Sequence, residues 1–255
     1  LSSGEASRLG LPKRTDEIDL TYGDVPVAAI AQVIAAARPA TGTLFYDLGS
    51  GVGRGVIAAA LLHQFACCVG IELLHDLHAA TEEPARRFAE VVRAVPRPDS
   101  SVDTERLSGR VEFVNADLFA CNLADDAASR REEAGQNQDQ LSTATTPLVF
   151  ICCVTWSPML MQRLASKLAE ELPEGTLVAT VGQRLPEMAD LLRGADGKDR
   201  GAVRFDEAWR GSEKFEWGSE VLILHQLSRI GVLAARRLRK SAASGPTAAA
   251  STKRR

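Results

Sequence analysis

The 255-residue chain has no apolar run long enough to cross a membrane. Its longest apolar stretches, residues 25–37 and 56–62, are shorter than the roughly 18 to 20 residues that a spanning helix needs. Cysteine is scarce, and its five residues form two adjacent pairs plus Cys121, with neither metal-ligand spacing nor a secretory hydrophobic segment beside them. Four scattered histidines complete no ligand set either. These absences predict a chain that does not insert into membranes, holds no metal and works in a reducing, intracellular setting.

Acidic residues are missing from the chain after Glu220, where eight lysines and arginines stand. Because the formal net charge of the whole chain is −3, everything before these residues is strongly acidic. An acidic body with a basic end predicts a polyanionic partner, such as nucleic acid, for that end. A solvated, disordered end is the alternative, and the Ala, Ser, Gly, Thr and Pro content beyond residue 240 favours disorder there.

The length of the chain allows one ordinary domain with appendages. Because the chain does not begin with methionine, we expect residues 1–19 to be a truncated or flexible segment. The domain itself is expected at residues 20–227, and residues 228–255 form the basic, largely disordered tail. Two polar segments, residues 96–109 and 125–146, are expected to be inserts that form surface loops.

Patterns typical of strands and of helices alternate along the chain. Asp24 is expected to cap the first helix, and Pro26 suits its first turn. The expected helices are residues 25–38, 55–64, 75–95 and 158–172. The expected strands are residues 43–48, 67–73, 111–114, 148–153 and 176–181, followed by a hairpin arm at 214–227 that ends in a strand at 221–227. Such alternation indicates an α/β fold, in which a mostly parallel sheet is covered by helices on both faces.

A glycine-rich loop follows the first expected strand, at the position where open parallel sheets bind ligands. Its glycines let the backbone approach a ligand closely, and the next helix points its amide end at that ligand. The dinucleotide fingerprint requires G-x-G-x-x-G, but Arg54 occupies the place of its third glycine. Asp47 would repel a pyrophosphate and attract an amino-acid ammonium, which favours S-adenosylmethionine over NAD. The predicted cofactor residues of this loop are Asp47, Gly49, Ser50, Gly51, Gly53 and Arg54.

Two further strand ends carry acidic residues. Glu72 ends the second expected strand, where a carboxylate can accept both hydroxyls of a ribose. Asp117 ends the third, where its oxygens can meet an adenine amino group while Leu118 packs on the ring. Each acid alone fits a helix cap or a loop charge equally well. Three acids at three successive strand ends, counting Asp47, favour a cofactor site.

Four segments also match a family pattern. They are the tetrapeptide Thr21-Tyr22-Gly23-Asp24 with the helix after it, the DLGSGVG loop, the segment VFICCVTWSP at residues 149–158, and Glu216-Trp217 with the strand after it. From about residue 20 to residue 227 the chain thereby resembles the disruptor-of-telomeric-silencing (Dot-type, non-SET) histone H3 lysine methyltransferases. Arg54 stands where that family commonly has glutamine. Cys152 and Cys153 replace two asparagines, which leaves backbone carbonyls to serve beside the transferred methyl group.

The resemblance implies a class I methyltransferase (Rossmann-like) fold with a mostly parallel seven-stranded sheet, and S-adenosylmethionine as cofactor. It adds to the predicted cofactor residues Tyr22, Gly23, Asp24, Val25 and Cys152. It also implies a catalytic lysine channel, whose aromatic and apolar walls would desolvate the substrate ammonium and lower its pKa. The expected channel residues are Trp156, Trp217 and Tyr22. Ordinary core packing is the alternative for both tryptophans, and small core hydrophobes are the usual role of paired cysteines in an apolar strand.

The partners implied are histone H3 in nucleosomes and, through the basic tail, DNA phosphates, with a monomeric protein in the nucleus. Methylation of a non-histone protein or of RNA is an alternative. Against RNA adenine stands the segment after residue 151, which lacks the Asn/Asp-Pro-Pro-aromatic tetrapeptide of adenine-amine methyltransferases. A chromatin-binding protein that keeps the cofactor but not the activity is a third hypothesis, because the two asparagines are missing.

Overall fold

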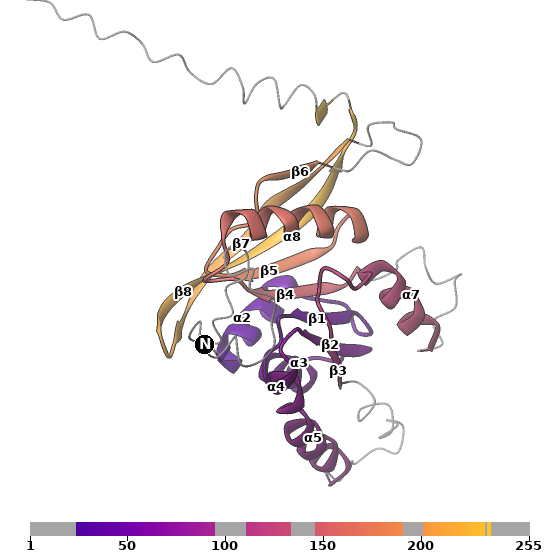
Figure 1. The fold of residues 1–255 in the computed structure, drawn as a ribbon, viewed down its shortest axis with the longest axis vertical. Helices are drawn as coiled ribbons and strands as arrows, with labels where there is room; N and C mark the ends of the chain where they lie inside the picture. Colours follow the sequence, from indigo (N-terminus) through magenta and orange to yellow (C-terminus); the bar gives the residue numbers. More distant parts are fainter. Residues whose placement is uncertain (1–23, 95–110, 134–145, 191–200, 233, 236–255) are drawn as a thin grey trace, which may run out of the picture.

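A single sheet organises the molecule, and eight strands take part in it within the described residues (Figure 1). The computed structural model describes residues 24–94, 111–133, 146–190, 201–232 and 234–235. The strands are β1 (Leu44–Leu48), β2 (Cys67–Glu72), β3 (Val111–Asn115), β4 (Leu148–Cys152), β5 (Leu177–Val181), β6 (Met188–Asp190), β7 (Ala202–Phe215) and β8 (Gly218–Ile230). Their order across the sheet is β3-β2-β1-β4-β5-β8-β7-β6.

The first five strands are parallel to their neighbours, whereas β8 is antiparallel to both β5 and β7. It follows that β7 runs in the same direction as the first five strands, and the expected mostly parallel sheet is confirmed. The short β6 adds an eighth strand to the seven that were expected. Strand order reverses between β1 and β4, which is the point where open α/β sheets bind ligands.

Helices cover both faces of the sheet, as the alternating sequence predicts. Helices α2 (Val27–Ala37), α3 (Arg54–Leu62) and α5 (Glu82–Ala94) pack on one face, and α7 (Leu123–Glu133) and α8 (Pro158–Glu171) on the other (Figure 1). Neighbouring residues of one strand therefore enter different cores: Phe45 packs on the α2 and α3 side, and Tyr46 on the α7 and α8 side. None of the helices in the described residues combines the length and the apolar content that a membrane-spanning helix requires.

The helix expected at residues 75–95 is two helices, α4 (His75–Ala79) and α5. Pro84 gives the physical reason, because its ring would clash with the carbonyl of Ala80 in a continuous helix. Thr81 also closes the break, since its hydroxyl donates to the carbonyl of His78 at 2.7 Å. Proline in this run was a signal that the sequence analysis did not use.

The hairpin arm is longer than expected, because it consists of the whole of β7 and β8 instead of residues 214–227. The two strands pair from Ala202 with Ile230 to Phe215 with Gly218, so β8 also continues three residues past the expected end of the strand at Leu227. Charged residues on both faces of β7 hide the strand pattern, since much of its length is exposed or half-buried on both sides.

The prediction that residues 125–146 form a surface loop is wrong in its first part, because residues 125–133 belong to helix α7. Asn122 caps this helix by accepting from the backbone N–H groups of Ala124 at 3.0 Å and Asp125 at 3.2 Å. Leu123 and Ala127 are buried against the sheet. The remaining insert residues, 134–145, lie outside the described residues, as does the insert expected at 96–109.

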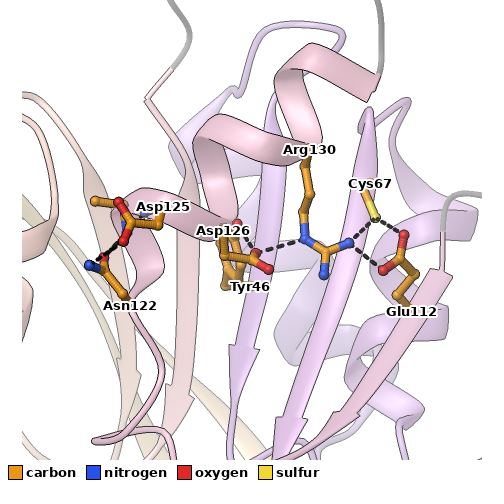
Figure 2. A network of polar contacts seen from close by, with 8 residues as sticks. Tyr46, Cys67, Glu112, Asn122, Asp125, Asp126 and Arg130 are labelled. Atoms are coloured by element: carbon orange, nitrogen blue, oxygen red, sulfur yellow. Dashed lines mark hydrogen bonds and ion pairs between the residues drawn. The ribbon is translucent and has the colours of Figure 1, made fainter.

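A polar network fastens α7 to the sheet (Figure 2). The Tyr46 hydroxyl donates to the Asp126 carboxylate at 2.7 Å, and Arg130 Nε donates to the same carboxylate at 2.7 Å. Arg130 also forms an ion pair with Glu112 of β3, which accepts from the Cys67 thiol at 3.6 Å. These charged side chains anchor the helix together with the buried Leu123 and Ala127, which explains why its sequence is mostly polar.

Candidate cofactor-binding site

A pocket lies at the carboxyl ends of β1 and β4, where the strand order reverses. It is lined by Asp24, Val25, Asp47, Gly49, Ser50, Gly51, Arg54, Gly55 and Cys152. The structure therefore brings together eight residues that the sequence analysis assigned to the cofactor. Gly55 is the lining residue that sequence reasoning missed.

Asp47 supplies the buried charge of this pocket. The residue is 3% exposed and lines the pocket. Burial, with a smaller contribution from the negative charge of Glu72, raises the pKa of Asp47 to about 7. A carboxylate of this kind is stabilised by a cationic or hydrogen-donating ligand group, and the amino-acid ammonium of S-adenosylmethionine is both.

Gly55, the second residue of α3, leaves the space that the Asp47 side chain uses. A Cβ atom at Gly55 would lie 2.5 Å from Asp47 Oδ2. Glycine lowers helix stability at such a position, so its presence is explained by this contact. A glycine inside an alanine-rich helical run was the signal available in the sequence.

Glu72, which is 7% exposed, ties the glycine loop to β2. Its Oε2 accepts from the N–H of Gly51 at 2.8 Å, and its Oε1 accepts from the N–H of Leu74 at 2.8 Å. Each carboxylate oxygen can accept a second hydrogen bond. Glu72 is not among the residues that line the pocket, so its contact with the ribose hydroxyls stays a prediction. The loop glycines at positions 49, 51 and 53 all have positive φ, at 84°, 54° and 82°. Glycine suits such a backbone, because a side chain there would be strained.

The two ends of the pocket are joined by an ion pair. Arg54 Nη1 lies 2.5 Å from Asp24 Oδ2, and both side chains line the pocket. The N-cap residue of α2 is Pro26, so Asp24 does not occupy the capping position that was expected. The predicted cofactor residues Tyr22 and Gly23 lie outside the described residues.

Asp117 and Leu118, the residues expected to meet the adenine, follow β3 and do not line this pocket. Asp117 is exposed, and its Oδ1 accepts from the N–H of Phe119 at 2.8 Å. Leu118 is half-buried against the core on the α8 side. Gly53 lies near the same strand, because a Cβ atom there would meet the Phe113 ring at 2.4 Å. The adenine contact stays a prediction.

The two tryptophans expected in the lysine channel are associated with different cores. Trp156 packs against the core on the α7 and α8 side. Trp217 is 42% exposed in the turn between β7 and β8, where its ring lies 4.9 Å from that of Phe215, a residue of the opposite core. Its Nε1 donates to Glu220 at 3.0 Å. The described residues therefore do not show the two rings lining one channel. The lysine channel stays a prediction.

The paired cysteines differ in position. Cys152 lines the pocket, whereas Cys153 is fully buried and its thiol donates to the carbonyl of Val181 at 3.3 Å. Burial raises the pKa of both thiols to about 12, so both are neutral at physiological pH. Among the described residues, no group of three or more His, Cys, Asp and Glu side chains is arranged to hold a metal ion.

The strand order, the glycine loop and the two acids at successive strand ends together define a class I methyltransferase. The chain belongs to the family described as "Histone methylation protein DOT1", which matches residues 15–183. It is therefore an S-adenosylmethionine-dependent methyltransferase, and Asp47 and Glu72 are suited to that cofactor as described above.

Solved structures of other methyltransferases are similar to the chain at low identity. One is an RNA methyltransferase from Salinibacter ruber in complex with S-adenosyl-L-homocysteine, with 21% identity, a TM-score of 0.47, and coverage of 80% of this chain and 94% of that one. Another is precorrin-6y C5,15-methyltransferase from Geobacter metallireducens, with 13% identity, a TM-score of 0.43, and coverage of 84% and 95%. A search of curated proteins finds no match.

Proposed function

We propose that the chain transfers a methyl group from S-adenosylmethionine to a lysine of the histone H3 globular core on nucleosomes. The observation that supports this most is the match to the histone methylation family over residues 15–183, which includes the whole of the pocket. The nuclear location, the monomeric state and the contact of the basic tail with DNA phosphates are parts of the same proposal.

In this proposal the residues of the chain bind, orient and desolvate. Asp47 holds the ammonium of the cofactor, and Glu72 holds its ribose while fixing the glycine loop. The cofactor supplies an electrophilic methyl group on a sulfonium. When bound, the cofactor would pass this methyl group to a neutral lysine nitrogen and leave as S-adenosylhomocysteine, and the methylated amine would release a proton to solvent.

Attack requires a neutral amine, so the acceptor side must disfavour the ammonium form. Apolar walls do so by desolvation, which lowers the pKa of a lysine. Trp156, Trp217 and Tyr22 are the residues proposed for these walls. A channel of this kind needs no dedicated base.

The test measures transfer of radiolabelled methyl to intact nucleosomes, free histone H3 and total RNA in parallel. Gly51→Arg fills the pocket and should abolish both cofactor binding and transfer. The matched control is Leu61→Arg, which adds the same side chain at a position of α3 that is 63% exposed. We expect labelling of H3 in nucleosomes, lost in Gly51→Arg and retained in Leu61→Arg.

A second candidate is a chromatin protein that binds the cofactor without transferring its methyl group. It is favoured by Cys152 and Cys153, whose neutral thiols replace the amides of the resembling family. Cofactor binding with no labelling of any substrate would support this candidate. Labelling of RNA alone would contradict both proposals.

A further inference from the structure

Gln183 lies two residues after β5 and makes three contacts with the segment that follows β4. Its Nε2 donates to the carbonyls of Cys153 at 2.7 Å, Val154 at 3.1 Å and Trp156 at 2.7 Å. One side-chain amide thus binds three of four successive residues. The amide offers two N–H groups to three carbonyl oxygens. An oxygen atom in the position of Nε2 would be repelled by these carbonyls, because all of them are acceptors.

The segment that Gln183 holds begins directly after a pocket residue. Cys152 lines the cofactor pocket, and the turn after it is closed by the N–H of Trp156, which donates to the carbonyl of Cys153 at 3.2 Å. Three carbonyls of this turn therefore face Gln183. From the sequence, unspecified backbone carbonyls near the two cysteines were expected to serve beside the transferred methyl group.

The backbone around Gln183 is itself fixed, so it provides a rigid support. The N–H of Gly182 donates to the carbonyl of Val221 at 2.9 Å, and the N–H of Leu185 donates to His225 Nε2 at 3.4 Å. Gly182 also permits close approach, because a Cβ atom there would lie 2.8 Å from the Cα of Val154. The end of β5 thus abuts the turn after β4 through both backbone and side chain.

We propose that Gln183 is a positioning residue for methyl transfer, which holds the turn from Cys153 to Trp156, directly after the pocket residue Cys152, in place on the acceptor side of the site. It supplies, from the segment after β5, a side-chain amide to the segment after β4, where the two cysteines supply none. The assignment of this turn to the acceptor side rests on the proposed function. The contacts that Gln183 makes do not depend on that function. The effect of replacing Gln183 on the structure can therefore be measured without a substrate.

Two variants separate the amide donor from the size of the side chain. Gln183→Met keeps the length and removes the donors, whereas Gln183→Glu turns acceptor oxygens toward three carbonyls. We expect kcat to fall about tenfold in the first and further in the second, while the cofactor Kd changes less than about twofold. Because a protonated carboxyl can donate one hydrogen bond, Gln183→Glu should partly recover at low pH, relative to the unaltered protein, and Gln183→Met should not.

A substrate-free measurement uses Trp156, one of three tryptophans in the chain. With Trp209→Phe and Trp217→Phe as background, acrylamide quenching of Trp156 should increase in both Gln183 variants. The matched control is Thr176→Val, which removes a side-chain hydrogen bond of 2.8 Å to the Pro173 carbonyl at the other end of β5. Its Trp156 quenching should not change.

The readouts distinguish this proposal from the proposed function. Unchanged Trp156 quenching in Gln183→Glu would overturn the positioning role, and so would a cofactor Kd that weakens in proportion to kcat. If the unaltered protein methylates no substrate, the proposed function fails, whereas increased quenching with an unchanged cofactor Kd would still support the role of Gln183.

Discussion

At the scale of the residue, Asp47 has the property most open to measurement. Burial and the charge of Glu72 raise its pKa to about 7, so a large share of this side chain is neutral just below that pH. A neutral carboxyl attracts an ammonium less than a carboxylate does. We expect the affinity for S-adenosylmethionine to rise between pH 6 and pH 8, approaching about tenfold per pH unit below the pKa, measured by calorimetric titration.

The control for this prediction is Asp47→Asn, which should bind the cofactor more weakly and with little dependence on pH. As pH rises, the folding stability of the unliganded protein should fall while its affinity for the cofactor rises. Because the pKa of Asp47 is raised above its usual value of 3.8, the stability of the folded state falls as pH rises from about 4 through 7. A cofactor affinity that is flat from pH 6 to pH 8 would contradict the assignment of Asp47 to the ammonium.

The second prediction concerns Gly55→Ala. Replacing glycine by alanine inside a helix usually stabilises a protein by about 0.5 to 1 kcal/mol. Here the new Cβ atom would lie 2.5 Å from Asp47 Oδ2, so the buried carboxylate has to move. We expect a cofactor Kd at least tenfold higher, measured by titration, in a protein that still unfolds cooperatively. An unchanged Kd would mean that the position of Asp47 is unimportant.

At the scale of the element, α8 holds the segment that follows β3. Three of its side chains stand four residues apart, and so share one face of the helix. They are Arg163, Lys167 and Glu171. The Arg163 guanidinium lies 4.0 Å from the centre of the Phe119 ring, Lys167 donates to the carbonyl of Cys121, and Glu171 accepts from the N–H of Leu123 at 2.9 Å. The segment held in this way, residues 119–123, directly follows Asp117 and Leu118, the pair expected to meet the adenine.

The third prediction is that Lys167→Met loosens this segment. The side chain of Lys167 is 6% exposed and pairs with Glu171 at 2.5 Å, so its loss should also destabilise the fold by up to about 3 kcal/mol. We expect weaker binding of S-adenosylhomocysteine and a smaller preference for it over the analogue that carries inosine. The two dissociation constants, measured side by side, give that preference.

Arg229→Met is the control, because Arg229 binds the C-terminal end of the same helix from β8, through backbone carbonyls. Its guanidinium donates to the carbonyls of Leu172 at 2.9 Å and Ala169 at 3.4 Å. This variant should lose stability without losing the preference for adenine. If both variants reduce the preference equally, α8 acts through general stability and the adenine assignment of Asp117 loses its support.

The sequence predicted the elements whose apolar pattern is local, and it failed where distant residues decide. Strands β1, β2, β4 and β5 are buried along most of their length, so their apolar runs were readable. Helix α7 was missed because its anchor, Arg130, finds its partners on β2, β3 and its own helix.

The residues of the candidate site also fall into those that the local sequence predicts and those that depend on distant residues. Asp47, Glu72 and the glycines are adjacent to strand ends in the sequence, so their positions were predictable. Gln183 was not, since its acceptors are about 30 residues earlier in the chain and meet it only because β4 and β5 are neighbours.

At the scale of the whole molecule, charge is unevenly distributed along the chain. Arg229, counted with the basic tail in the sequence analysis, belongs to β8 and is engaged with α8. Seven lysines and arginines remain at residues 236–255, after an acidic body. A basic end on an acidic domain favours attraction to a polyanion through that end, since the body itself would be repelled.

The last prediction follows from this separation. Deleting residues 236–255 should weaken nucleosome binding at low salt and leave the cofactor Kd unchanged. If the tail binds DNA phosphates, it releases counterions, and seven contacts would contribute a slope of up to about 6 in the dependence of log affinity on log salt concentration. Binding of the full chain and of the truncated chain, measured from about 50 to 200 mM salt, gives both slopes. Equal slopes would place the nucleosome contact on the domain and not on the tail. Since the domain is acidic, such a contact would have to be made with basic histone surface instead of DNA.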